Sequence, residues 1–188
     1  MNVSNCLTIS RIIIAFFCMG LIIKNNLISL IVSFLLFLIA SFTDFLDGFI
    51  ARKKNKISDL GKLLDPIADK ILVLGIFLSF LVLKIINVWM VIVIMIREFI
   101  ITGLRLLALN RGYVLEAKKV GKHKTLTQTS SITFIFVILI LKKIFTQSKL
   151  IDFLYQTVIP LFMWYIVIIT AFSGLHYLWI NRKIIRDF

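Results

Sequence analysis

Four aspartates with a regular spacing are the residues of this chain best suited to chemistry. Asp44 and Asp47 are three residues apart and Asp65 and Asp69 are four apart, so each pair falls on one face of a helix. Their carboxylate oxygens are hard ligands that suit Mg²⁺, Mn²⁺ or Ca²⁺ better than zinc. Carboxylates this close would not all ionise without cations between them. The pattern therefore predicts a site for a pair of divalent ions, which would polarise a phosphoryl group.

Residues that suit phosphate binding lie between and beside the two aspartate pairs. Gly48 and Ala51 are small enough for a ligand or another backbone to approach closely. Arg52 offers a planar fork of donors for phosphate oxygens. Gly61 leads into the next helix, whose N-terminus also favours phosphate. The segment as a whole indicates metal-assisted chemistry on a phosphate ester.

The rest of the chain is apolar enough to place these residues in a membrane protein. Of the 188 residues 60% are hydrophobic, and the mean hydropathy is +1.02, which no water-soluble domain of this length shows. We therefore expect one all-α, polytopic transmembrane domain over residues 1–188. We expect Pro66 in the first turn of its third helix and a kink at Pro160 in its sixth. Six transmembrane helices are predicted, over approximately Leu7–Ile23, Leu27–Ile50, Leu63–Leu83, Ile86–Leu109, Thr125–Leu141 and Phe153–Ile180.

The aspartates are costly in such a chain. A carboxylate near the middle of a membrane helix costs roughly 2.5–3.5 kcal/mol, and this segment holds four of the nine acidic residues. Two interpretations other than phosphate chemistry remain open. The acids could pair with nearby lysines such as Lys62 and Lys70, or they could form the cation site of a transporter.

The basic residues predict the orientation of the helices. The net charge is +13, and the cations cluster after the second, fourth and sixth apolar segments. The positive-inside rule then places both termini and these connections in the cytoplasm, so we expect the aspartates at the cytoplasmic face of the membrane. Anionic membrane lipids and phosphorylated substrates, rather than nucleic acid, are the partners that this charge favours.

The complete pattern resembles a known signature. The run D-x2-D-G-x2-A-R-x8-G-x3-D-x3-D, from Asp44 to Asp69, is similar at every specified position to that of the CDP-alcohol phosphatidyltransferases. The resemblance implies six transmembrane helices, a homodimer and two divalent metal ions, Mg²⁺ or Mn²⁺. It implies that Asp44, Asp47 and Asp65 ligate metal and that Asp69 completes the site and acts as general base. It also implies that Gly48, Ala51, Arg52 and Gly61 contact the CDP part of the lipid substrate.

Cations further along the chain suit a second, anionic substrate. Arg97 lies near the middle of its apolar segment, so we expect it to face a polar cavity rather than lipid. Arg105 follows about two turns later, and Lys122 and Lys124 open the fifth segment. Two interpretations without substrate remain: Arg97 and Glu98 as a local pair, although adjacent helix residues do not face each other, and the lysines as ordinary orientation signals.

These cations belong to motifs that resemble one branch of the family. R-E-F at Arg97, followed by L-R at Arg105 and by G-K-x-K-T-x-x-Q from Gly121 to Gln128, is similar to phosphatidylglycerophosphate synthases. The resemblance implies transfer of a phosphatidyl group from CDP-diacylglycerol to sn-glycerol 3-phosphate. Arg97, Arg105, Lys122 and Lys124 would then bind glycerol 3-phosphate. A cardiolipin synthase, or transfer to another phosphorylated alcohol, is the alternative within the same fold.

Overall fold

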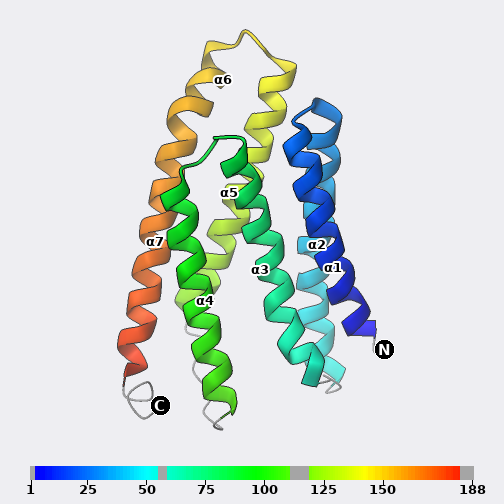
Figure 1. Cartoon of the computed structure of the whole chain (residues 1–188), viewed down its shortest axis with the longest axis vertical. Helices are drawn as coiled ribbons and strands as arrows, with labels where there is room; N and C mark the ends of the chain where they lie inside the picture. The colour runs from blue at the N-terminus through cyan, green and yellow to red at the C-terminus, as the bar shows by residue number, and fades with distance from the viewer. Residues whose placement is uncertain (1–2, 55–58, 111–118, 183–188) are drawn as a thin grey trace.

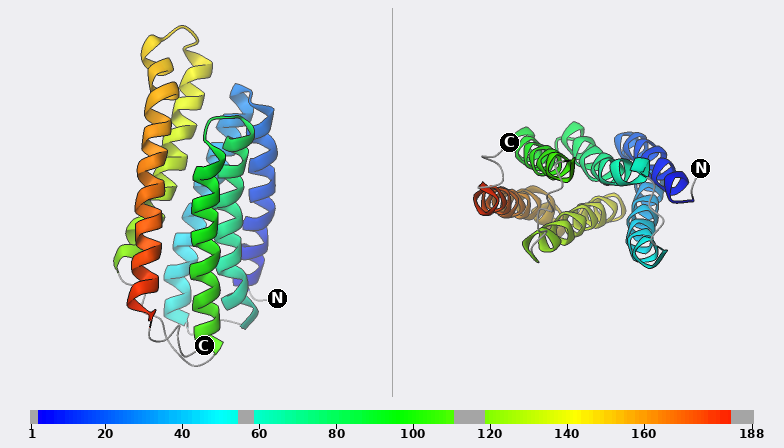
Figure 2. Two further views of the ribbon diagram at one scale, coloured as in Figure 1. Left: turned by 60° about the vertical axis from the view of Figure 1, so that its left-hand side comes forward. Right: turned by 90° about the horizontal axis from the view of Figure 1, so that it is seen from below.

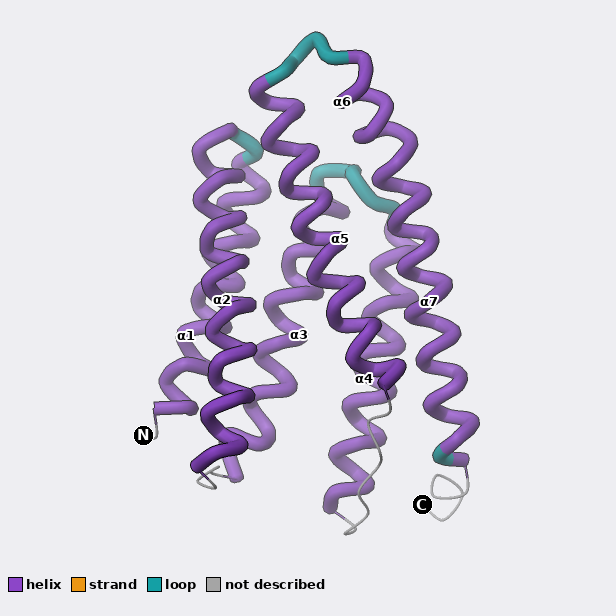
Figure 3. The backbone as a smooth tube through the Cα atoms, turned by 180° about the vertical axis from the view of Figure 1, so that it is seen from behind, coloured by secondary structure: helices purple, strands orange, loops and turns teal. Residues whose placement is uncertain are grey.

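The described part of the chain consists of helices joined by short turns and contains no strand (Figure 3). The computed structural model describes the backbone of residues 3–54, 59–110 and 119–182 and the side chains of residues 8–43, 67–108 and 126–182. Because α6, η1 and α7 follow one another without a break, the helices form six long rods, as the hydropathy predicts. The elements are α1 (Val3–Lys24), α2 (Leu27–Lys54), α3 (Asp59–Val82), α4 (Val88–Asn110), α5 (Lys119–Ile144), α6 (Lys149–Phe153), the π-helical turn η1 (Leu154–Val158) and α7 (Ile159–Ile180).

The helices alternate in direction, as the distribution of charge requires. Figure 1 shows both ends of the chain, together with the ends of α2, α3, α4 and α5 that the predicted basic connections join, at one end of the bundle. The tight turns that join α1 to α2 and α3 to α4 lie at the opposite end. Asn25 and Lys84, with φ of 50° and 57°, occupy the left-handed region in these two turns. The end that carries the termini is therefore also the end toward which the aspartate segment lies.

Four of the six rods begin earlier than their apolar segments predict, and α1 (from Val3) and α5 (from Lys119) are two of them. α3 begins at Asp59 rather than Leu63, so Pro66 lies in its second turn and not, as expected, in its first. The sixth rod begins at Lys149 rather than Phe153. Near Pro160, where a kink is predicted, the rod widens into η1, and the Ile159 N–H donates to the Leu154 carbonyl, five residues back. A π-helical turn is a usual place for a long helix to change direction.

The first three helices form one side of the bundle (Figure 2). α1 packs against both α2 and α3. The Ser33 hydroxyl on α2 donates to the Cys18 carbonyl on α1 at 3.2 Å. A Cβ on Gly75 of α3 would lie 2.7 Å from Met19 Sδ, so the approach of α1 to α3 depends on the missing side chain. This close packing fixes α3, which carries two of the four aspartates.

The outer surface of the bundle suits a hydrocarbon environment. Large apolar side chains are exposed along several helices, among them Phe17, Phe42 and Phe172, each more than 60% exposed. Within the described residues, Leu126–Ile144 and Lys149–Ile180 are long and apolar enough to cross a membrane on length and composition alone. Together with the six-rod arrangement, this makes the chain an all-α membrane protein.

Candidate active site

An aromatic cluster holds α2, α3 and α5 at one level and fixes the depth of the residues below it. The Phe136 ring on α5 lies 5.3 Å from the Phe34 ring and 6.1 Å from the Phe37 ring, both on α2. It also lies 5.4 Å from the Phe80 ring of α3, centroid to centroid. Toward the end of the bundle that carries the termini, Asp44 follows Phe37 by seven residues, about 10 Å along the helix axis.

Measured from the same aromatic cluster, Asp69 lies at a depth comparable to that of Asp44. It precedes Phe80 by eleven residues, about 16 Å along α3. Because α2 and α3 run in opposite directions, the backbones of Asp44, Asp47, Asp65 and Asp69 all lie below the aromatic cluster, toward one end of the bundle. The prediction that the two pairs occupy one end of two antiparallel helices is consistent with this arrangement.

The structure describes the side chain of only one of the four aspartates. Asp69 is partly buried and follows the fully buried Ala68. The side chains of Asp44, Asp47 and Asp65 lie outside the described residues, although their backbones are helical. No group of three or more His, Cys, Asp or Glu side chains gathers among the residues whose side chains are described. Three of the four predicted ligands fall outside that set, so the metal site stays a prediction.

The residues predicted to contact the CDP group lie on the same two helices. Gly48, Ala51 and Arg52 belong to the last two turns of α2, and Gly61 is the third residue of α3. Their side-chain environment is likewise outside the described residues. Their helical positions place them closer than the aspartates to the end of the bundle that carries the termini.

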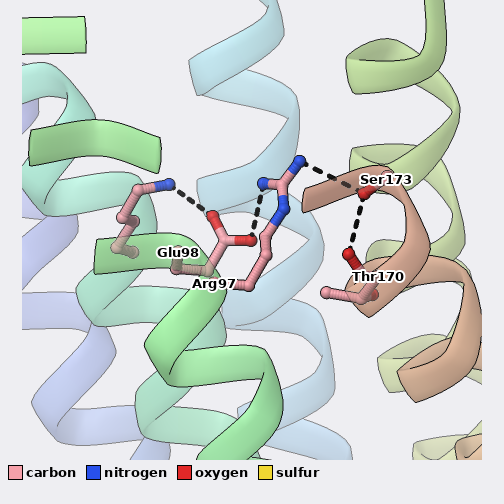
Figure 4. A network of polar contacts seen from close by, with 5 residues as sticks. Arg97, Glu98, Thr170 and Ser173 are labelled. Atoms are coloured by element: carbon pink, nitrogen blue, oxygen red, sulfur yellow. Dashed lines mark hydrogen bonds and ion pairs between the residues drawn. The ribbon is translucent and has the colours of Figure 1, made fainter. Parts of the chain in front are cut away.

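A buried ionic network joins α3, α4 and α7 (Figure 4), and its member on α3, Lys70, directly follows Asp69 in the sequence. Lys70 Nζ on α3 lies 2.6 Å from Glu98 Oε2 on α4, and Arg97 Nη1 donates to Glu98 Oε1 at 3.1 Å. Arg97 Nη2 reaches Ser173 Oγ on α7 at 3.3 Å, and Ser173 in turn donates to the Thr170 carbonyl. The Glu98 side chain is 4% exposed. Lys70 therefore pairs with Glu98. This contact disfavours the alternative in which Lys70 pairs with the aspartates.

Among the described residues, the pocket that Arg97 lines is apolar, in place of the polar cavity that the sequence predicts. Arg97 lies at a groove of about 250 Å³ between α4 and α7, lined mainly by apolar side chains such as Val93, Ile100 and Leu175. Its polar partners are instead the adjacent Glu98 and Ser173. The Arg97 side chain is long enough for its guanidinium to fold back on Glu98. Glu98 also contacts Lys70 of α3, and Arg97 also contacts Ser173 of α7.

A glycine makes room for this arrangement. A Cβ on Gly174 of α7 would lie 2.9 Å from Arg97 Cγ. Sequence reasoning missed Lys70, Ser173 and Gly174 as members of a network. A serine and glycine in an apolar helix give no signal of their own.

The other predicted acceptor residues lie toward the end of the bundle that carries the termini. Arg105 is exposed on α4, about two turns beyond Arg97. Lys122 and Lys124 lie in the first turns of α5, with side chains outside the described residues. The backbone thus brings these three cations to the same end of the molecule as the aspartates, whereas Arg97 is engaged in the buried network.

Comparison with known proteins finds relatives along most of the chain. A relative from Bacillus subtilis is 39% identical over 143 residues, which cover 76% of this chain and 69% of the relative. A relative from Rickettsia typhi is 35% identical over 178 residues, which cover 94% of both chains. A relative from Mycoplasma genitalium is 36% identical over 122 residues, which cover 65% of this chain and 52% of the relative.

All three relatives bear one name, CDP-diacylglycerol–glycerol-3-phosphate 3-phosphatidyltransferase. The sequence profile of the CDP-alcohol phosphatidyltransferases matches residues 1–172. This range contains the four aspartates, the glycines and arginine between them, and most of the buried network. The chain belongs to the CDP-alcohol phosphatidyltransferase family.

Proposed function

We propose that the protein transfers the phosphatidyl group from CDP-diacylglycerol to sn-glycerol 3-phosphate, giving phosphatidylglycerol phosphate and CMP. The observation that carries the proposal is the agreement with the Rickettsia typhi relative of that name over 94% of both chains. The predicted motifs for both substrates lie within this aligned length. The fold supports the proposal because the parts of α2, α3, α4 and α5 that carry these motifs lie toward one end of the bundle.

The donor set fits a divalent metal site. Asp44, Asp47, Asp65 and Asp69 offer carboxylate oxygens, and none of the four is a soft ligand that would favour zinc or copper. When bound, Mg²⁺ or Mn²⁺ ions, two of them by analogy with the family signature, would neutralise charge on the pyrophosphate. Gly48, Ala51, Arg52 and Gly61 would hold the CDP part, with Arg52 donating to phosphate oxygens.

Asp69 is the proposed general base. Its carboxylate would take the proton from the acceptor hydroxyl, whose oxygen then attacks the phosphorus that bears the diacylglycerol. The bond between this phosphorus and the oxygen of CMP breaks, and CMP leaves. Partial burial of Asp69, next to the fixed Lys70–Glu98 pair, supports this role because the base must be held in place while its partner reacts.

Four cations would attract and hold the acceptor. Arg105, Lys122 and Lys124 are the proposed direct ligands of the glycerol 3-phosphate phosphate. Arg97 would contribute mainly through its charge, since its two terminal nitrogens are engaged by Glu98 and Ser173. Among the described side chains the network holds two cations, Lys70 and Arg97, and one carboxylate, Glu98, and cations close to a site raise the local concentration of an anionic substrate.

We infer that the enzyme lies in the bacterial cytoplasmic membrane, with its active site at the cytoplasmic face. The cluster of basic residues at the end with the termini supports this orientation. A homodimer is proposed from the family resemblance.

The proposal is tested by CMP release from CDP-diacylglycerol in detergent, with and without candidate acceptors. We expect release that depends on Mg²⁺ or Mn²⁺ and on sn-glycerol 3-phosphate, with inositol inactive. Release with phosphatidylglycerol but not with glycerol 3-phosphate would assign the protein as a cardiolipin synthase. The absence of metal-dependent CMP release with every alcohol would contradict an enzyme of this family and favour a transporter.

A further inference from the structure

A buried glutamine on α5 has a donor group without a partner. The Gln128 residue is 3% exposed, and within the described part of the chain its side-chain nitrogen finds no hydrogen-bond acceptor. Its backbone carbonyl, by contrast, accepts a 2.7 Å bond from the Ser131 hydroxyl. A buried amide donor left unpaired costs about 1–3 kcal/mol, so its presence calls for an explanation.

Gln128 faces the interior of the bundle and not the lipid. Residues seven and eleven positions further on lie on the same face of the helix, and both, Ile135 and Leu139, are buried. Phe136, on the adjoining part of this face, packs against rings of α2 and α3. The side chain therefore lies on the inward face of α5, next to the part of that face that packs against α2 and α3. In Figure 3, which views the bundle from behind, α5 runs along the near side, between α2 and α7.

Its depth matches that of the candidate active site. Gln128 precedes Phe136 by eight residues, about 12 Å along α5. The corresponding depths below the same aromatic cluster are about 10 Å for Asp44 and about 16 Å for Asp69. The unpaired donor thus lies between the levels of the two aspartates.

We propose that Gln128 determines acceptor specificity by donating a hydrogen bond to the non-reacting hydroxyl of the acceptor. This inference rests on the proposed function. Glycerol 3-phosphate has a phosphate at one end, a hydroxyl that attacks at the other, and a second hydroxyl between them. Lys124, four residues before Gln128 on the same helix, is a predicted phosphate ligand. One helical turn, about 5.4 Å, separates them, a spacing suited to two neighbouring groups of one small molecule.

The chemistry of the side chain favours this assignment. A neutral amide donor does not compete with the aspartates for metal ions, and it gains a hydrogen bond only when an oxygen is brought to it. A site built to bind a hydroxyl strongly disfavours the analogue that lacks it, because the donor of the protein then stays unpaired.

The test compares two acceptors in the full-length enzyme: sn-glycerol 3-phosphate and 3-hydroxypropyl phosphate, which lacks only the middle hydroxyl. In the wild type we expect kcat/KM for glycerol 3-phosphate to exceed that for the analogue about 10–100-fold. In Gln128→Met, of similar volume but without a donor, the value for glycerol 3-phosphate falls by about the same factor and the value for the analogue changes little. The ratio between the acceptors therefore collapses toward one.

Ser131→Ala is the matched control, since this buried hydroxyl lies one turn further on and bonds only to its own helix among the contacts described. Its acceptor ratio should equal that of the wild type. The thermal stability of Gln128→Met, measured without substrate, should equal or exceed the wild-type value, because an unpaired donor has been removed.

Three results would overturn the inference. They are a wild-type ratio near one, a Gln128→Met ratio equal to the wild-type ratio, or an equal loss with both acceptors. If Gln128→Met does not fold, the ratio is measured on Gln128→Glu, which has the same shape and lacks the amide donors. Failure of both variants to fold would assign Gln128 to packing. Wild-type turnover with glycerol 3-phosphate decides the proposed function separately, before any variant is compared.

Discussion

Glu98→Gln removes the negative charge at the centre of the buried network and leaves the shape of the side chain almost unchanged. In the structure the Glu98 carboxylate lies within 2.6 Å of Lys70 Nζ and 3.1 Å of Arg97 Nη1. The exposed fractions of the three side chains are 4%, 17% and 12%. The variant leaves two cations facing each other between α3 and α4 with the carboxylate gone.

The expected loss of stability is large because these groups are shielded from water. Removing one partner of a buried ion pair costs about 3–5 kcal/mol. For a chain of 188 residues, each kcal/mol corresponds to about 2–4 °C in Tm. The predicted decrease for Glu98→Gln is therefore about 6–20 °C. Lys70→Met/Glu98→Gln, which removes a cation as well, should recover at least part of this loss through coupling between the two residues.

The assay is thermal unfolding of purified protein in one detergent, followed by the loss of the monodisperse peak. Asp152→Asn is the matched control, since Asp152 pairs with Lys142 at 3.4 Å with 46% and 35% of the side chains exposed. An exposed pair contributes about 0–1 kcal/mol, so its Tm should change by less than about 4 °C. A decrease for Glu98→Gln no larger than for Asp152→Asn, or a double variant less stable than Glu98→Gln, would refute the electrostatic reasoning.

Three further predictions follow from the same arrangement. Gly174→Ala should lower stability by about 1–3 kcal/mol because its Cβ would meet Arg97 at 2.9 Å; Gly103→Ala, with nothing within 4 Å, should not lower it, and equal effects would contradict a steric cause. Asp69→Asn should abolish CMP release while CDP-diacylglycerol binding persists; a near-normal rate would exclude the base assignment. Arg105→Ala should raise KM for glycerol 3-phosphate more than for the lipid, and equal increases would argue against an acceptor role.

The sequence predicted the six long helices because the free energy of membrane insertion depends on composition along the chain. The limits of the helices were less predictable. α3 starts four residues before its apolar segment, at Asp59, and the last rod starts at Lys149. Polar residues at these ends interact with water while the backbone is already helical, so hydropathy alone places the boundary too late.

The candidate site was predictable to the extent that it is local in sequence. The aspartates and their glycines occupy one stretch, and a helical period relates them. The Arg97 network could not be found in this way, because its partners come from three helices, with Ser173 located 76 residues beyond Arg97. The rule that adjacent helix residues do not face each other argued against an Arg97–Glu98 contact. The structure nevertheless forms it, in a chain of contacts in which Glu98 also pairs with Lys70 of α3 and Arg97 also bonds to Ser173 of α7.

The most direct test of the proposed activity follows the acceptor into the product. Labelled sn-glycerol 3-phosphate is incubated with CDP-diacylglycerol, Mg²⁺ or Mn²⁺ and the purified protein, and the label in the lipid fraction is compared with the CMP released. The account predicts lipid-bound label in phosphatidylglycerol phosphate, equal in amount to CMP and absent when the divalent ion is chelated. CMP release without label in lipid, or label in lipid that does not require CDP-diacylglycerol, would contradict it.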